Sequence, residues 1–378
     1  MKLTIPFNKP FVSGQEAHYI QQVLDSGKLA GNGVFTQKCQ TYFQDRYHFH
    51  KCLLTTSCTD ALEMAAILLD ILPGDEVIMP SYTFVSTANP FVLRGAKIVF
   101  VDSRADHPGI DEKDIEALIT TKTKAIVVVH YAAVACDMDT VMDIANRHGL
   151  WVIEDAAQAI DAYYKGKPLG GIGHLAAFSF HETKNIVCGE GGMLVINDER
   201  FVKRAEVIWE KGTNRSAFFR GEVDKYGWVD VGSSFLPSEL IAAFLYAQLE
   251  NLEYIQEKRC RIWKSYCVGL HGLAMEEKIK LPLIPAFATH NGHIFYIVLK
   301  NQEERSALIG QLQANGIQAV FHYLSLHESP FYLEKHDGRN LSCSSNYTDC
   351  LLRLPLYFEL TEMEQNNVLD TIKRFFAH

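Results

Sequence analysis

The chain has 378 residues, of which 48% are hydrophobic and 21% are charged, a composition that fits a soluble globular enzyme with two packed domains. Its formal net charge of −9, without a run of basic residues, argues against a nucleic-acid-binding protein. No window approaches about eighteen consecutive apolar residues and the nine cysteines form no CxxC pair, so we expect a cytoplasmic protein with reduced thiols and no membrane insertion.

Apolar, β-branched runs alternate with amphipathic helical stretches in the first part of the chain. The strand-like runs cover residues 51–56, 76–80, 96–102, 124–130, 150–156, 175–180 and 191–198. Helix-like stretches lie between several of them, at residues 58–71, 111–120 and 137–149. Continuously apolar strands separated by helices indicate a mostly parallel sheet that is covered on both faces.

The pattern changes after residue 235. A long helical stretch covers residues 236–268, and it is followed by strand-like, helix-like and strand-like runs at 293–300, 303–316 and 317–323. We therefore predict an α/β fold with two domains. Residues 1–235 would form a large domain with a mostly parallel seven-stranded sheet between helices, and residues 236–378 a connecting helix and a small α+β domain.

Two of the predicted strands lead to residues with specific chemistry. The segment VIEDAAQ (152–158) brings Asp155 to the end of a buried strand, and LAAFSFHETKN (175–185) delivers Lys184 after another. Pyridoxal phosphate needs such a pair in an enzyme. A lysine amine binds the cofactor covalently, and a carboxylate keeps its ring nitrogen protonated. A lone lysine after a strand is usually a solvated surface residue, so the interpretation depends on the neighbouring motifs.

Those motifs occur in a characteristic order. EDAAQ, FSFHETKN and GEGG (189–192) together resemble the fold-type I aminotransferases, and more narrowly the DegT/DnrJ/EryC1/StrS family of nucleotide-sugar aminotransferases. The similarity extends from SGKLAGNG (26–33) to LLRLPLYFELT (351–361). It implies a fold-type I fold, pyridoxal 5'-phosphate as cofactor, Lys184 and Asp155 as catalytic residues, and a homodimer with shared active sites.

The resemblance also implies a site for the cofactor phosphate. The segment SCTDAL (57–62) stands where the family has S-G-T-x-A-L, at a predicted helix N-terminus. This implies that Thr59 and the backbone of Cys58 and Asp60 contact the phosphate, together with Ser179. Ser57 as a plain helix N-cap is the alternative reading of the same segment.

Two further residues are assigned to the cofactor ring. The segment TFVSTAN (83–89) resembles the family's T-F-V-A-T-A-N, in which the aromatic residue stacks on the ring, and this implies that role for Phe84. Without the resemblance, a phenylalanine in the hydrophobic core would be the expected interpretation. Gln158 is assigned to the side of the ring that carries the phenolic oxygen.

The segment GSSFLPSE (232–239) aligns with the family's G-Y-N-Y-R-L-T-E. The resemblance implies that Ser234 contacts the phosphate bound in the other subunit. Leu236 replaces the family's arginine, so the cation for a substrate or donor carboxylate is open. The candidates for this cation are Arg215, Arg220 and Lys225, in the segment 210–228. It is equally possible that these residues lie on a solvated loop and bind no substrate.

The segment FHYLSLH (321–327) resembles the family's H-Y-x-P-L-H near the substrate pocket and implies that His322 and Tyr323 contact the substrate. Two histidines five residues apart, His322 and His327, could also suggest a metal. Because no cysteine or carboxylate ligands lie near them in sequence, we expect no metal site.

The long segments VHYAAVACDMD (129–139) and EKGTNRSAFFRGEVDKY (210–226) narrow the implied reaction. They imply amination of C4 of dTDP-4-keto-6-deoxy-D-glucose by L-glutamate to the galactose-configured amine, for a cell-surface polysaccharide such as an O-antigen or a shared surface polymer. The glucose-configured epimer and another nucleotide-linked keto sugar remain open. Related sugar dehydratases have histidine in place of the lysine, so the presence of Lys184 argues against a dehydratase. A non-catalytic regulatory protein with the same fold is the remaining alternative.

Overall fold

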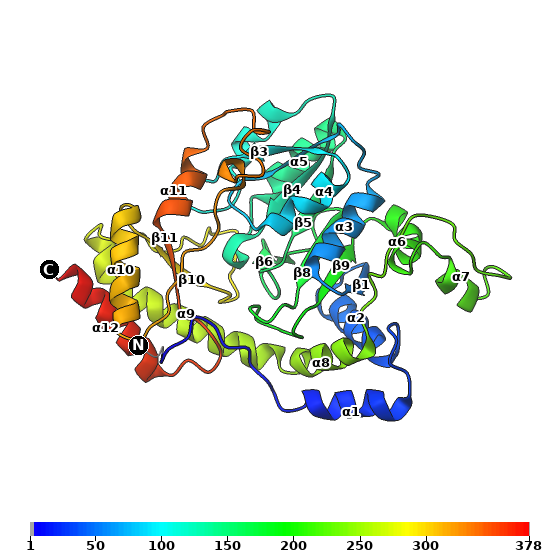
Figure 1. Cartoon of the computed structure of the whole chain (residues 1–378), viewed down its shortest axis with the longest axis horizontal. Coiled ribbons are helices and arrows are strands. Elements are labelled where there is room, and N and C mark those ends of the chain that lie inside the picture. The colour runs from blue at the N-terminus through cyan, green and yellow to red at the C-terminus, as the bar shows by residue number, and fades with distance from the viewer. Residues whose placement is uncertain (1–3, 378) are drawn as a thin grey trace.

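The computed structural model describes residues 4–377, and a seven-stranded sheet lies at its centre (Figure 1). Its strand order is β1-β9-β8-β5-β4-β2-β3. The strands are β1 (Lys51–Thr55), β2 (Glu76–Pro80), β3 (Lys97–Val101), β4 (Thr123–Val129), β5 (Trp151–Asp155), β8 (Leu175–Ser179) and β9 (Gly192–Ile196). The pairs from β3 to β8 are parallel, and β9 is antiparallel to both β8 and β1. The predicted sheet is therefore confirmed.

Side chains of the strands enter two separate hydrophobic cores because successive residues of a strand face opposite sides of the sheet. On β2, Ile78 belongs to one core, and Val77 and Met79 belong to the other. The first core includes helices α2 (Val34–Tyr47), α5 (Met138–His148) and α8 (Glu239–Leu249). The second includes α3 (Cys58–Leu68), α4 (Asn89–Leu93) and α6 (Val202–Trp209).

The predicted helix over residues 111–120 is wrong. This stretch forms two short 3₁₀ turns, η2 (Glu112–Asp114) and η3 (Glu116–Leu118). The buried carboxylate of Glu112 accepts a hydrogen bond from the backbone of Asp137 at 2.6 Å, which fixes the first turn against the neighbouring loop. The β-branched residues that follow, Ile119 and Thr120, then disfavour continuation of a helix.

The long helical stretch predicted after residue 235 is two helices. They are α8 and α9 (Leu252–Met275), with a break at residues 250–251. α8 packs against α1 (Glu16–Ser26) and α2, whereas α9 continues to the C-terminal part of the molecule. Among residues 4–377, no helix has the length and apolar character needed to cross a bilayer.

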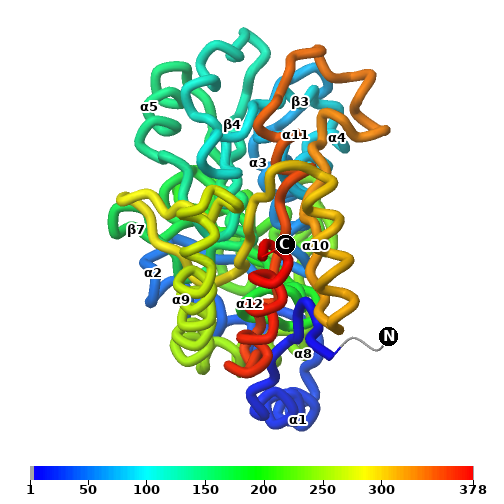
Figure 2. The backbone as a smooth tube through the Cα atoms, turned by 90° about the vertical axis from the view of Figure 1, so that its left-hand side faces the viewer, coloured from blue at the N-terminus to red at the C-terminus, as the bar shows by residue number. Residues whose placement is uncertain are grey.

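The C-terminal part is a small antiparallel pair of strands covered by helices. β10 (Phe295–Val298) pairs with β11 (Leu351–Leu354), and α10 (Gln302–Ala314), α12 (Glu362–Phe376) and α9 lie beside one another (Figure 2). The strand predicted over residues 317–323 is wrong. That segment makes only single bridges, at Ile317 and Val320, because it passes from one partner to another without a continuous ladder.

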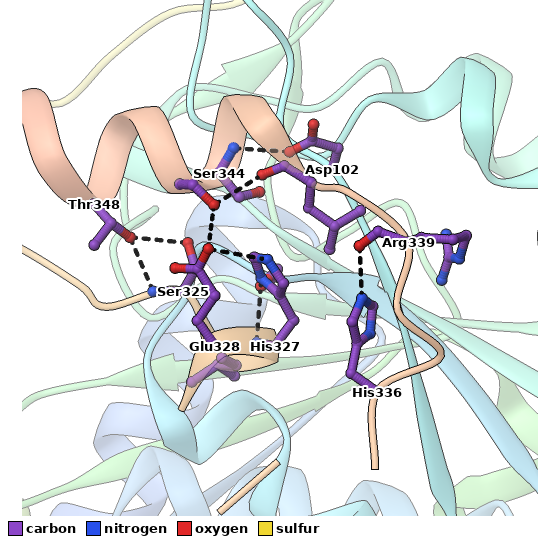
Figure 3. A network of polar contacts seen from close by, with 12 residues as sticks. Asp102, Ser325, His327, Glu328, His336, Arg339, Ser344 and Thr348 are labelled. Atoms are coloured by element: carbon purple, nitrogen blue, oxygen red, sulfur yellow. Dashed lines mark hydrogen bonds and ion pairs between the residues drawn. The ribbon is translucent and has the colours of Figure 1, made fainter. Parts of the chain in front are cut away.

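A polar network ties α11 (Ser342–Cys350) and the segment before it to the large sheet (Figure 3). The carboxylate of Asp102, just after β3, accepts hydrogen bonds from the backbone of Cys343 and Ser344 at 3.0 and 2.7 Å. A carboxylate at this place satisfies the free N–H groups of a helix start. His327 is hydrogen-bonded to Ser81 at 2.7 Å, at the end of β2. The network thereby holds the neighbouring residues 321–327 over the carboxyl edge of the sheet.

Candidate active site

A cavity of about 570 Å³ contains Lys184 and Asp155 at the carboxyl ends of the strands, where parallel sheets bind ligands. Its wall includes residues from both parts of the chain. The residues assigned from sequence that line this cavity are Cys58, Thr59, Phe84, Asp155, Gln158, Ser179, Lys184, His322 and Tyr323. Segments far apart in sequence therefore meet at one site.

Asp155 is a buried carboxylate without a charged hydrogen-bond partner. Its Oδ2 accepts a hydrogen bond from the hydroxyl of Thr87 at 2.7 Å, and its Oδ1 accepts one from the backbone of Ala157 at 3.2 Å. Burial raises the pKa of Asp155 above its usual value. A cationic group in the cavity would reverse this effect, because an opposite charge favours the ionised carboxylate.

Lys184 lies in the turn between β8 and β9, and its neighbour Asn185 anchors that turn. The buried amide of Asn185 donates to Gln256 at 2.7 Å and to the backbone of Asn291 at 2.9 Å. Its oxygen is hydrogen-bonded to His293 at 2.9 Å. Burial lowers the pKa of the Lys184 amine, which raises the fraction of neutral, nucleophilic amine.

One end of the cavity is the N-terminus of α3. Ser57 is the N-cap, and its hydroxyl accepts a hydrogen bond from the backbone of Asp60 at 3.0 Å. The N–H groups of Cys58 and Thr59 precede that of Asp60 in the first turn, where the helix itself provides no acceptor. These two N–H groups are therefore suited to bind an anion. A Cβ atom on Gly192 would lie 2.4 Å from the Cys58 nitrogen, so only glycine lets β9 pass beneath this turn.

Another part of the wall is aromatic and polar. Phe84 has 55% of its surface exposed and lines the cavity, so it is not a residue of the hydrophobic core. Its ring centre lies 6.1 Å from that of Tyr323. The amide of Gln158 accepts a hydrogen bond from the backbone of Ala132 at 2.7 Å and donates one to the Tyr323 hydroxyl at 3.0 Å. His322 is hydrogen-bonded to Tyr131 at 2.6 Å.

These features fit the cofactor that the sequence resemblance implies. No cationic side chain among residues 4–377 makes a hydrogen bond to Asp155, and a protonated ring nitrogen could make one. The free N–H groups at the start of α3 suit a phosphate, and the exposed face of Phe84 suits a planar ring. The amine of Lys184, in the same cavity, suits a covalent link to such a cofactor.

Five residues assigned from sequence lie outside this cavity wall. The N–H of Asp60 is already donated to Ser57, which leaves it unavailable for a phosphate. Ser234 and Arg215 line a second cavity of about 730 Å³. Arg220 is paired with Glu206 and Glu222, and Lys225 is on the exposed segment after α7 (Arg215–Phe219).

Three residues at the site were not predicted from the sequence. Thr87 belongs to the same TFVSTAN segment as Phe84, and Asn185 directly follows Lys184. Arg353 stands inside the apolar run LLRLPL, and it lines the cavity. A charged residue within a buried strand was the one signal that could have identified Arg353, because such residues are rarely buried unless they are paired.

Comparisons with known proteins show the family and the fold. The sequence profile of the DegT/DnrJ/EryC1/StrS aminotransferase family matches residues 11–373. DesV of S. venezuelae, solved in complex with a ketimine intermediate, is 30% identical, with a TM-score of 0.90 over 99% of each chain. A DegT DnrJ EryC1 StrS aminotransferase from Brucella abortus is 29% identical, with a TM-score of 0.87 over 96% of each chain. The PLP form of Spr1654 from Streptococcus pneumoniae is 25% identical, with a TM-score of 0.90 over 99% of this chain and 98% of that one.

Proposed function

The chain belongs to the DegT/DnrJ/EryC1/StrS aminotransferase family, and from that premise we propose a specific reaction. Enzymes of this family are sugar aminotransferases that use pyridoxal phosphate, so the reaction class and the cofactor follow from the membership. In the proposed reaction, L-glutamate gives its amino group to C4 of dTDP-4-keto-6-deoxy-D-glucose. The product, dTDP-4-amino-4,6-dideoxy-D-galactose, would enter a cell-surface polysaccharide, and the reaction would take place in the cytoplasm.

The observation that carries the proposal is that Lys184 and Asp155 line one cavity. Bound pyridoxal phosphate supplies an electron-withdrawing ring that stabilises negative charge on the carbon that loses a proton. Asp155 holds the proton on the ring nitrogen, and Thr87 and Ala157 fix the direction of its carboxylate. The Lys184 amine would form the covalent link to the cofactor and, as a free amine, would carry the proton to and from the reacting carbon.

Other residues of the same cavity serve the phosphate and the ring. Thr59, Ser179 and the N–H of Cys58 bind the cofactor phosphate, and Phe84 covers one face of its ring. Gln158, whose amide is held by Ala132 and Tyr323, contacts the phenolic-oxygen side. What supports these assignments is that all of them line the cavity that contains Lys184.

A cluster of cations supports a nucleotide-linked substrate. The second cavity is lined by three cations, Lys28, Lys211 and Arg215, and by one carboxylate, Glu210, in a chain whose net charge is −9. Three cations in an otherwise acidic protein suit a diphosphate. Ser234 lines the same cavity, which supports a homodimer in which this cavity faces the partner's cofactor.

Exposed apolar side chains support the same homodimer. Figure 1 shows α7 and the segment after it projecting from the body of the molecule. Trp228 is 84% exposed and Phe219 is 69% exposed, and Tyr226 and Val229 beside them are also exposed. Grouped apolar side chains of this kind are typical of a protein–protein interface.

The experiment is a direct assay of the product. Purified enzyme with pyridoxal phosphate, L-glutamate and dTDP-4-keto-6-deoxy-D-glucose should give a 4-amino sugar, and a Lys184→Ala variant should give none. A small H3–H4 coupling constant in the proton NMR spectrum would identify the galactose configuration. A large coupling constant would identify the glucose-configured epimer instead, and no amine would contradict the proposed sugar.

A further inference from the structure

Arg353 is a cation in the cavity wall that the roles described above do not use. It lies on β11 and makes two backbone hydrogen bonds with Val320. Its guanidinium carbon is 4.4 Å from the centre of the Phe7 ring. The ring packs near the guanidinium, a contact that favours the cation and leaves in-plane N–H groups to bind an acceptor. Arg353 lines the same cavity as Lys184.

The guanidinium of Arg353 has unused donors. Three arginines among residues 4–377, Arg46, Arg305 and Arg353, have a buried Nε without a hydrogen-bond partner. The other nitrogens of two of these guanidinium groups have partners. Arg46 forms an ion pair with Glu253 at 3.0 Å, and Arg305 donates a hydrogen bond to the backbone of Thr348 at 2.6 Å. Arg353 has no such partner within the part of the chain that the structure describes. A partly buried cation without an acceptor is costly unless a ligand provides one.

The cavity needs this charge for a substrate. Its described wall contains two lysine or arginine side chains, Lys184 and Arg353. Three histidines also line the cavity. Burial holds the pKa values of His293 and His322 well below the usual range, so neither is a cation near neutral pH. The third, His181, lies 3.6 Å from the carboxylate of Glu190, which is its partner in the same wall. Lys184 is assigned to the cofactor. Burial also lowers the pKa of Arg353, but a guanidinium stays protonated in proteins.

A carboxylate matches this cation better than a diphosphate does. Three cations, Lys28, Lys211 and Arg215, already line the second cavity, whereas Arg353 is a single fork-shaped donor. A guanidinium binds one carboxylate through two parallel hydrogen bonds. The Tyr323 hydroxyl accepts a hydrogen bond from Gln158, so its own proton is free to strengthen an anion site in the same wall.

We propose that Arg353 binds a carboxylate of the amino donor and so positions the donor amine toward Lys184. The proposal rests on the proposed function, in which the donor is L-glutamate. In the resembled family an arginine stands where this chain has Leu236. Arg353 would supply the cation for a carboxylate that this replacement leaves unassigned.

The test uses glutarate, a five-carbon dicarboxylate that has no amine and cannot react. Its binding to the protein loaded with pyridoxal phosphate is measured by isothermal titration calorimetry. Arg353→Gln should weaken glutarate binding by about ten- to a hundredfold, since hydrogen bonds to a charged group are lost. Arg353→Lys should recover part of this loss. Arg305→Gln is the matched control, because Arg305 also lies near a phenylalanine, Phe321 at 5.8 Å, but outside the cavity wall.

Steady-state kinetics separates a donor site from general damage. The KM for L-glutamate should rise in Arg353→Gln by a factor similar to the loss of glutarate affinity, and the KM for the keto sugar should change by less than about twofold. Unchanged glutarate affinity, or an equal rise of both KM values, would overturn the proposal. Glutarate binding needs no keto sugar, so a wrong sugar assignment leaves the titration readable. Failure of the wild type itself to bind glutarate would reject the dicarboxylate donor before any variant is compared.

Discussion

Thr87 donates a hydrogen bond to Asp155 across 2.7 Å, and the bond joins the turn after β2 to the end of β5. The hydroxyl of Thr83 lies 2.8 Å from that of Thr87 and extends the chain of hydrogen bonds. The other carboxylate oxygen of Asp155 accepts from the backbone of Ala157. Both oxygens are therefore fixed by the protein alone, so the carboxylate is oriented before a cofactor binds.

Thr87→Val should test this orientation. Valine keeps the shape and removes the hydrogen bond, so we expect turnover to fall about tenfold, as for the loss of one hydrogen bond to a charged group. Thr87→Ser should restore most of the activity because its hydroxyl can make the same bond. The measurement is kcat with both substrates saturating. Equal activity of the valine and serine variants would show that the hydroxyl has no role in catalysis.

Asp155→Asn removes the charge and keeps the shape. The ring nitrogen should then lose its proton, so we expect turnover to fall by about two or more orders of magnitude, as for one preorganised electrostatic group. Cofactor binding should be retained, and absorbance spectroscopy of the loaded protein checks this. Near-normal turnover would mean that the carboxylate is structural.

Lys184→Ala should abolish turnover, because both the covalent link and the proton transfer depend on the amine. Borohydride reduction of the wild type should attach the cofactor permanently to the peptide that contains Lys184, as mass spectrometry can show. Lys203→Ala, on an exposed part of α6, is the control and should be labelled and active like the wild type. Label on any other lysine would contradict the assignment.

The sequence predicts most of the sheet because its strands are buried on both faces and leave continuous apolar runs. All seven runs correspond to strands, from Lys51–Thr55 to Gly192–Ile196. The segments 111–120 and 317–323 were mispredicted because tertiary contacts, at Glu112 and at Val320, decide their conformation. Local periodicity contains no information about such contacts.

The same limit applies to the site. Motifs predict Lys184 and Asp155 because pyridoxal phosphate requires a lysine and a carboxylate, and the resembled family has them in this order. Thr87 and Asn185 make hydrogen bonds to residues distant in sequence, Asp155 and Gln256, and Arg353 reaches the cavity wall only through the fold. Their hydrogen-bond donors and acceptors are recognisable only after the chain has folded.

Glu154 gives a prediction about stability. Its buried carboxylate accepts hydrogen bonds from His130 and from the backbone of Gly170, Ile172 and Gly173, at 2.6–2.8 Å. Glu154→Gln places an amide against these donors, so we expect the free energy of unfolding to fall by about 3 kcal/mol at pH 7, as for a broken buried pair. Glu253→Gln, at an exposed ion pair, should cost less than about 1 kcal/mol. Urea unfolding measures both.

The effect should depend on pH in a defined direction. Burial alone would raise the pKa of Glu154, but the hydrogen bonds from His130 and the backbone bring the pKa below its ordinary value of 4.5. The folded state thus favours the ionised form, and this stabilisation is complete above the unfolded pKa and lost as the pH falls through the folded pKa. The difference between wild type and Glu154→Gln should therefore shrink below about pH 4.5. A difference that stays constant down to acid unfolding would contradict this account.

Ser234 lines the second cavity and not the one that contains Lys184, which leads to a test of the shared active site. Lys184→Ala and Ser234→Trp should each be inactive as homodimers, the first without the amine and the second with a side chain too large beside the partner's phosphate site. When the two proteins exchange subunits, half of the dimers are mixed, and each mixed dimer has one site free of both changes. Activity should then return to about a quarter of the wild-type value, as expected for a two-fold pair. If subunits exchange and no activity returns, Ser234 acts within its own chain and the two sites are independent.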